Sequence, residues 1–98
     1  MILVRDVFQL KFGKAKEAKK LWKEGAKIES KYGYGPGRAM TDLTGPYYTL
    51  VIETTYDSLA AYENAMKNTL YANEFRAWYQ KFVPLVDSGR REIFTVIE

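Results

Sequence analysis

The segment ILVRDVFQLK, residues 2–11, carries an acidic side chain among apolar ones. Side chains along a strand alternate between two faces, so Asp6 shares one face with Ile2, Val4, Phe8 and Leu10. If that face packs against helices, desolvation raises the pKa of the Asp6 carboxyl and suits it to acid–base catalysis. The alternative is structural, in which Asp6 pairs with a lysine or arginine, caps a helix or lies at an exposed bulge. The sequence leaves both interpretations open.

The opposite face of the same strand carries a cation, Arg5. A strand predicted over 47–56 places Glu53 on the same face as Tyr47, Thr49 and Val51. An ion pair between Arg5 and Glu53 can form between neighbouring strands or across a dimer, and a role at an interface is favoured over catalysis. The candidate interface residues on these faces are Leu3, Arg5, Val7, Tyr47, Val51 and Glu53.

The composition excludes several kinds of chemistry. The chain of 98 residues contains neither cysteine nor histidine. Disulfides and thiolate catalysis are therefore excluded, as are the commonest general base at neutral pH and the commonest ligand of metals and haem. We expect no metal site and no cofactor.

The remaining pattern predicts the elements that position these residues. Helical spacing of apolar residues indicates a helix over 14–32, a helix that begins after Asp57 or Ser58, and a helical stretch over 72–83 that Pro84 ends or kinks. The segment 33–37, GYGPG, is a connection. Strands are predicted over 2–11, 38–44 and 47–56, and after a turn at Ser88–Gly89.

This order, β-α-β-β-α(α)-β, is the ferredoxin-like plan of the α+β class. It predicts one domain over 1–98, with a four-stranded antiparallel sheet and both helical segments on one face. The final strand, RREIFTVIE, has apolar side chains on both of its faces. Helices can cover only one face, and the other would be a large exposed apolar patch. The sequence therefore predicts a homodimer in which two sheets pack face to face.

Aromatic side chains of the helices are candidates for a ligand cavity. Trp22, Trp78 and Tyr79 lie on the apolar stripes of the predicted helices. Such stripes usually form the core, but they can also line a cavity for a flat organic ligand. The sequence leaves both roles open.

The first helix is rich in lysine, which raises the question of a nucleic-acid or anionic-membrane partner. Its seven lysines between Lys14 and Lys31 are interleaved with Glu17, Glu24 and Glu29. This mixture is typical of a solvated face, so we expect no nucleic-acid or membrane partner. The opening MILVRDVFQL is interrupted by charges and is not a signal peptide, and no stretch approaches the ~20 apolar residues of a membrane span. We therefore expect a cytoplasmic protein.

Three segments together resemble the dimeric α/β-barrel superfamily, and within it the NIPSNAP-like proteins. They are LVRDVFQLKFGKAKEA (3–18), TGPYYTLVIETTYDSLAAYENA (44–65) and FVPLVDSGRREIFTVI (82–97). The resemblance implies that two ferredoxin-like sheets form a barrel across a dimer, with ligand cavities between the sheet and the helices of each protomer.

The same resemblance implies two kinds of function. Some members of the superfamily are monooxygenases that need no prosthetic group, some degrade haem and some isomerise lactones, whereas many have no assigned activity. The absence of histidine argues against haem degradation here. One hypothesis is a non-enzymatic dimeric module for binding or scaffolding. The alternative is a small-molecule enzyme, a cofactor-independent monooxygenase or isomerase that acts on a hydrophobic or aromatic metabolite. An open cavity that contains Asp6 would favour the alternative.

Overall fold

The computed structural model describes residues 1–33, 35 and 37–98. Its elements are β1 (Ile2–Leu10), α1 (Ala15–Ser30), β2 (Gly37–Thr41), β3 (Thr49–Tyr56), α2 (Leu59–Leu70), α3 (Asn73–Phe82), the 3₁₀ turn η1 (Val83–Leu85) and β4 (Val86–Thr95). This is the predicted ferredoxin-like order. The predicted connection over 33–37 includes Tyr34 and Pro36, which lie outside the described residues.

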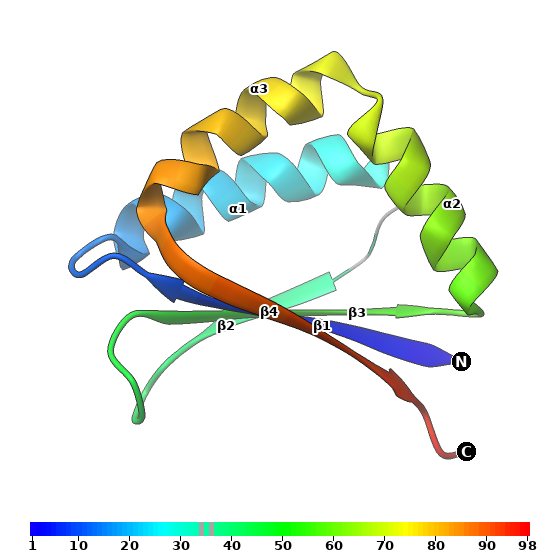
Figure 1. Cartoon of the computed structure of the whole chain (residues 1–98), viewed down its shortest axis with the longest axis horizontal. Helices are drawn as coiled ribbons and strands as arrows, with labels where there is room; N and C mark the ends of the chain where they lie inside the picture. The colour runs from blue at the N-terminus through cyan, green and yellow to red at the C-terminus, as the bar shows by residue number, and fades with distance from the viewer. Residues whose placement is uncertain (34, 36) are drawn as a thin grey trace.

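The four strands form one antiparallel sheet in the order β2-β3-β1-β4. The three helices lie on one side of the sheet and leave the other side uncovered, and both chain termini lie at the same end of the sheet (Figure 1). The predicted α+β class is therefore confirmed. None of the helices in the described part of the chain is both long enough and apolar enough to cross a membrane.

The central strand β1 divides the hydrophobic core into two clusters. Near its start, Ile2 and Val4 pack with Tyr56, Tyr62 and Ala65 beneath α2. Near its end, Leu10 packs with Ala18, Leu50, Trp78, Phe82 and Leu85, and Phe8 lies against this second cluster. Asp6 lies between the two groups on the same face of β1, as its alternation with these apolar residues predicts.

Helices α1 and α3 approach closely at a glycine. A Cβ atom built on Gly25 would lie 2.5 Å from Cε2 and Cζ2 of Trp78. The indole Nε1 of Trp78 donates a hydrogen bond of 2.6 Å to the carbonyl of Leu21. The glycine in the apolar stripe of α1 therefore makes room for the Trp78 ring.

Local signals explain most of the element boundaries. The Ser58 hydroxyl accepts a hydrogen bond of 3.1 Å from the backbone N–H of Ala61, so Ser58 is the N-cap of α2. Pro84 lies in the η1 turn directly after α3, where its missing N–H costs no helical hydrogen bond. Both observations confirm the predicted positions.

Two predictions about the strands are wrong. Ser88 and Gly89 do not form a turn, because β4 already begins at Val86 and Gly89 pairs with Phe8 of β1. A Cβ on Gly89 would lie 2.9 Å from Cδ1 of Phe8, so glycine here lets the ring lie over the strand. Tyr47 precedes β3 instead of belonging to it, and its exposed ring contacts Phe12 with 6.1 Å between the ring centroids.

Replacement of Gly25 by alanine should destabilise the protein although alanine is the better helix former. The added methyl group overlaps the Trp78 ring, and we expect a net loss of about 1–3 kcal/mol in the free energy of unfolding. Urea denaturation measures the change. The exposed neighbour Glu24 provides the control, since Glu24→Ala should change stability by less than about 0.5 kcal/mol. A Gly25→Ala variant that is more stable than the wild type would contradict the packing described here.

Candidate functional site

A cavity of about 360 Å³ lies between the sheet and the helices, beside the Asp6 position of β1. Its apolar lining comes mainly from rings of Phe8, Trp22, Trp78 and Phe82, together with Ile52. Asp6, Glu29 and Arg91 supply most of the charge of its polar side. A volume of this size, with an aromatic wall and a few converging polar groups, is typical of small-molecule sites.

Asp6 is held in an ion pair. The Nε atom of Arg91 donates a hydrogen bond of 2.6 Å to Oδ1 of Asp6, and the Asp6 side chain is 20% exposed. The two residues are direct cross-strand partners in β1 and β4. The structural interpretation of Asp6, pairing with an arginine, therefore describes its surroundings better than an isolated carboxyl in an apolar pocket.

Glu29 is the carboxyl group whose proton affinity the cavity changes most. The pKa of Glu29 is raised from 4.5 to about 7: burial in the cavity wall is the largest cause, the negative charge of Asp6 adds to the rise, and Arg91 opposes both effects. Its place in the last turn of α1, at the negative end of the helix dipole, does not favour an anion either. Glu29 can therefore take up or release a proton near neutral pH.

Two tyrosines complete the electrostatic surroundings of these carboxyl groups. The rings of Tyr56 and Tyr62 are buried, with their centroids 5.2 Å apart. The guanidinium carbon of Arg91 lies 5.9 Å from the centre of the Tyr62 ring, within the range of a cation–π interaction. Burial raises the pKa of Tyr56, contact with the backbone of Gly35 opposes this, and the charge of Glu29 adds to the rise. Tyr56 therefore stays protonated at neutral pH.

The structure brings together most of the residues that the sequence singled out for this site. Asp6, Trp22 and Trp78 line the cavity. Tyr79 does not belong to its lining: the residue is 51% exposed and borders a neighbouring hollow on the surface of α3 and β4. Its expected place in the cavity wall is therefore not observed, because it lies on the outer side of α3.

Glu29 was missed because it was assigned to the solvated Lys/Glu face of the first helix. The spacing contains the signal that would have found it, since Trp22, Ala26 and Glu29 follow one another at intervals of four and three residues. Residues at this spacing share one face of a helix. All three line the cavity.

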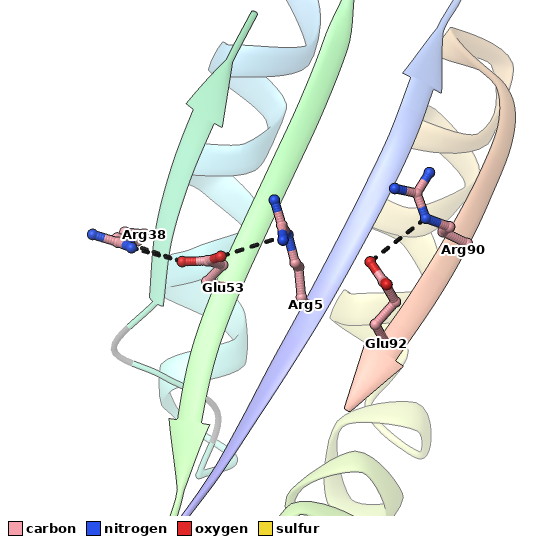
Figure 2. Close-up of polar contacts among 5 residues, drawn as sticks. All are labelled: Arg5, Arg38, Glu53, Arg90 and Glu92. Atoms are coloured by element: carbon pink, nitrogen blue, oxygen red, sulfur yellow. Dashed lines mark hydrogen bonds and ion pairs between the residues drawn. The ribbon is translucent and has the colours of Figure 1, made fainter. Parts of the chain in front are cut away.

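The uncovered face of the sheet carries the second group of candidate residues. Glu53 Oε1 accepts hydrogen bonds of 3.0 and 2.8 Å from Nε and Nη2 of Arg38, while its Oε2 lies 3.6 Å from Nε of Arg5. Arg90 and Glu92 form a further pair at 3.5 Å (Figure 2). The predicted Arg5–Glu53 pair thus forms between neighbouring strands within one chain.

The described residues offer little for metal binding. Across residues 1–33, 35 and 37–98, no three histidine, cysteine, aspartate or glutamate side chains are grouped so that they could hold a metal ion. The acidic groups of the cavity are paired with, or lie close to, Arg91. Their chemistry is therefore that of ion pairing and proton transfer.

The family model named NIPSNAP matches residues 5–98. The chain belongs to the NIPSNAP family. This confirms the resemblance found in the three sequence segments. A search of curated protein sequences finds no match.

Solved structures of other NIPSNAP proteins share the fold along almost the whole chain. An uncharacterized NIPSNAP domain protein from Burkholderia xenovorans has a TM-score of 0.92 at 16% identity, covering 99% of this chain and 95% of that one. A NIPSNAP family protein from Agrobacterium tumefaciens has a TM-score of 0.89 at 18% identity, covering 99% and 86%. SnoaB, a cofactor-independent oxygenase from Streptomyces nogalater, has a TM-score of 0.76 at 13% identity, covering 99% and 93%. At these identities the similarity establishes the fold of this NIPSNAP protein.

The raised pKa of Glu29 predicts that stability falls between mildly acidic and neutral pH. A group whose pKa is raised in the folded state contributes to the free energy of unfolding. This contribution is fully present below pH 4.5 and is lost as the pH rises through about 7. The full shift corresponds to at most ~3 kcal/mol, and partial solvent access reduces this to about 1–3 kcal/mol. The glutamine of Glu29→Gln cannot ionise, so this variant does not lose stability in this way. Between pH 5 and pH 8, its free energy of unfolding should therefore rise by that amount relative to the wild type.

Urea denaturation at the two pH values measures this difference. Glu24→Gln, at an exposed site of the same helix, should follow the wild type at both. A Glu29→Gln variant that follows the wild type at both pH values would show that Glu29 titrates in the folded state as it does in the unfolded chain.

Proposed function

We propose that this NIPSNAP protein binds a small organic molecule with a flat apolar body in the cavity beside Asp6, and that Glu29 exchanges a proton with it. The observation that carries the proposal is the position of Glu29, a carboxyl with a pKa of about 7 in the wall of an open, aromatic-lined cavity. Of the two hypotheses drawn from the sequence, small-molecule chemistry is therefore favoured over a purely scaffolding role.

The lining supports a ligand with two unlike parts. Rings of Phe8, Trp22 and Trp78 offer contact area to an apolar or aromatic body. The Asp6–Arg91 pair offers fixed charges that can orient a polar group. A hydroxyl, enol or carboxyl group at one end of the ligand matches this arrangement, because each can exchange a proton with Glu29.

Proton transfer is the step that these groups can perform. When Glu29 is ionised it can accept a proton from a ligand hydroxyl or enol, and when it is protonated it can return one. Asp6 acts as a positioning residue, since its negative charge favours the protonated form of Glu29. The lack of histidine and cysteine suits chemistry without a bound metal. The shared fold with SnoaB, a cofactor-independent oxygenase, makes a reaction of that class the leading enzymatic form of the proposal.

The proposal includes a homodimer joined through the uncovered sheet faces. Val7 of this face is already buried, but Leu3 and Val51 are partly exposed and Phe94 of β4 is 44% exposed beside Leu3. A second copy would remove these side chains from water, which is the main driving force of association. We retain the cytoplasm, expected from the sequence, as the working location of this homodimer.

Binding of 4-nitrophenol and 4-nitrobenzoate tests the cavity directly. The chain has two tryptophans, and both line the cavity, so tryptophan fluorescence responds to a probe bound at or near this site. We expect saturable quenching by at least one probe. Ala26→Leu should weaken binding by at least about tenfold, because the larger side chain fills the cavity.

Two further variants sharpen this test. Ala60→Leu, at an exposed position of α2, should bind the probes like the wild type. Glu29→Gln should keep probe binding but change the pH at which bound 4-nitrophenol ionises. Equal quenching in the wild type and in Ala26→Leu would rule out the cavity as the binding site.

The homodimer is tested by a charge placed on the uncovered face. Val51→Asp buries two carboxylates, one from each copy, and each unpaired buried charge costs several kcal/mol. Dimer affinity should therefore fall by more than about 100-fold. Sedimentation equilibrium at low micromolar concentration should show a wild-type dimer, and Leu59→Asp, on exposed α2, should leave it intact. A well-folded wild-type monomer under these conditions would contradict the homodimer.

A further inference from the structure

A second hollow, of about 390 Å³, adjoins the cavity of about 360 Å³ described above. It lies between α3 and β4, and it is called the neighbouring hollow below. The walls of the two spaces have four residues in common, which are Asp6, Phe8, Phe82 and Arg91. Because they share this wall, the cavity and the neighbouring hollow lie directly beside each other.

The strand register shows how the two spaces follow one another across the sheet. Asp6 of β1 pairs with Ile52 of β3 on one side and with Arg91 of β4 on the other, so these three residues form one row. Ile52 lines the cavity but not the neighbouring hollow, whereas Asp6 and Arg91 line both. The row therefore runs from the cavity to β4, an outer strand of the sheet, over two strand spacings of about 10 Å in total.

Phe8 gives the two spaces a common apolar wall. Its ring lies over Gly89 of β4, where a Cβ atom would come within 2.9 Å of Cδ1 of Phe8. The ring also meets the Phe82 ring edge to face, with 5.2 Å between the centroids. The glycine therefore lets the Phe8 ring extend from β1 towards β4, where it borders the cavity and the neighbouring hollow at once.

The outer part of the neighbouring hollow is apolar and open to solvent. Val83 and Val86 line it at the corner where α3 passes through η1 into β4 (Figure 1). Tyr79 of α3 also lines it, and Tyr79 and Val83 are 51% and 49% exposed. Half-exposed apolar side chains on a concave surface offer contact area that a ligand can remove from water.

We propose that the ligand site continues from the cavity into the neighbouring hollow, and that its ligand is an elongated molecule with two linked aromatic rings. This inference rests on the proposed function and adds the length of the ligand. The ring with the proton-exchanging group lies in the cavity, since Glu29 lines only that space, and the second ring lies against Tyr79 and Val83. Arg91 in the shared wall suits such a ligand, because a guanidinium can stack on an aromatic face.

Two probes that differ by one ring test the proposed length. They are 4-nitrophenol and 4-hydroxy-4′-nitrobiphenyl, which carry the same two polar groups. Isothermal titration calorimetry measures the affinity of each. The wild type should bind the biphenyl at least about tenfold more tightly, because the second ring removes additional apolar surface from water.

Variants of the neighbouring hollow show where the second ring binds. Val83→Trp fills this space and Tyr79→Ala removes part of its wall, so each should weaken biphenyl binding by at least about fivefold. Both should bind 4-nitrophenol like the wild type, because neither residue lines the cavity. Unchanged binding of 4-nitrophenol also shows that each variant is folded. Lys81→Trp is the matched control: Lys81 is exposed on α3 and lines neither space, so this variant should bind both probes like the wild type.

The outcomes separate this inference from the function on which it rests. A wild-type protein that binds none of 4-nitrophenol, 4-nitrobenzoate and the biphenyl contradicts the proposed function and the longer site with it. A wild-type protein that binds 4-nitrophenol in the cavity, but the biphenyl no more tightly, overturns the longer site alone. A biphenyl affinity that Val83→Trp and Tyr79→Ala both leave unchanged overturns it in the same way.

Discussion

An ion pair between two neighbouring strands shapes the site of this protein. Asp6 occupies the middle of the helix-facing side of β1, where the other side chains are apolar, and a carboxylate there needs a partner. Arg91 supplies it from the adjacent position of β4. The apolar core divides around this pair into one cluster beneath α2 and another beneath α1 and α3. The cavity lies between them, and Glu29 reaches it from the end of α1.

Because β1 lies in the centre of the sheet, its alternation determines both surfaces. Even-numbered residues face the helices and form the core and the cavity, whereas Arg5 and Val7 face the uncovered side. The proposed ligand site and the proposed dimer interface are therefore opposite sides of one strand. A change in register would move each set of side chains to the wrong face at once, which explains how so short a chain can hold two distinct sites.

The sequence predicted the features that depend on local periodicity. Alternation along residues 2–11 was enough to identify the faces of β1, helical spacing along 14–32 identified the apolar stripe of α1, and Ser58 was recognisable as a cap. Features that depend on distant contacts were missed. Gly89 was assigned to a turn, since a glycine after a serine is typical of one. Its contact with the Phe8 ring cannot be inferred from the residues next to it in the sequence. Glu29 was assigned to the solvated face because lysines surround it in the sequence, although its spacing from Trp22 places both residues on one face of the helix. The same limit applied to Asp6, whose partner Arg91 lies 85 residues away.

The most direct test of this account is the titration of the Glu29 carboxyl carbon by ¹³C NMR in the folded wild-type protein. Burial in the cavity wall and the charge of Asp6 predict a midpoint at about pH 7. Arg91→Gln should move the midpoint higher, since Arg91 favours the ionised form. A midpoint near the ordinary value of 4.5, unchanged in Arg91→Gln, would contradict the account, because Glu29 would then be a solvated surface residue with no proton to exchange near neutral pH.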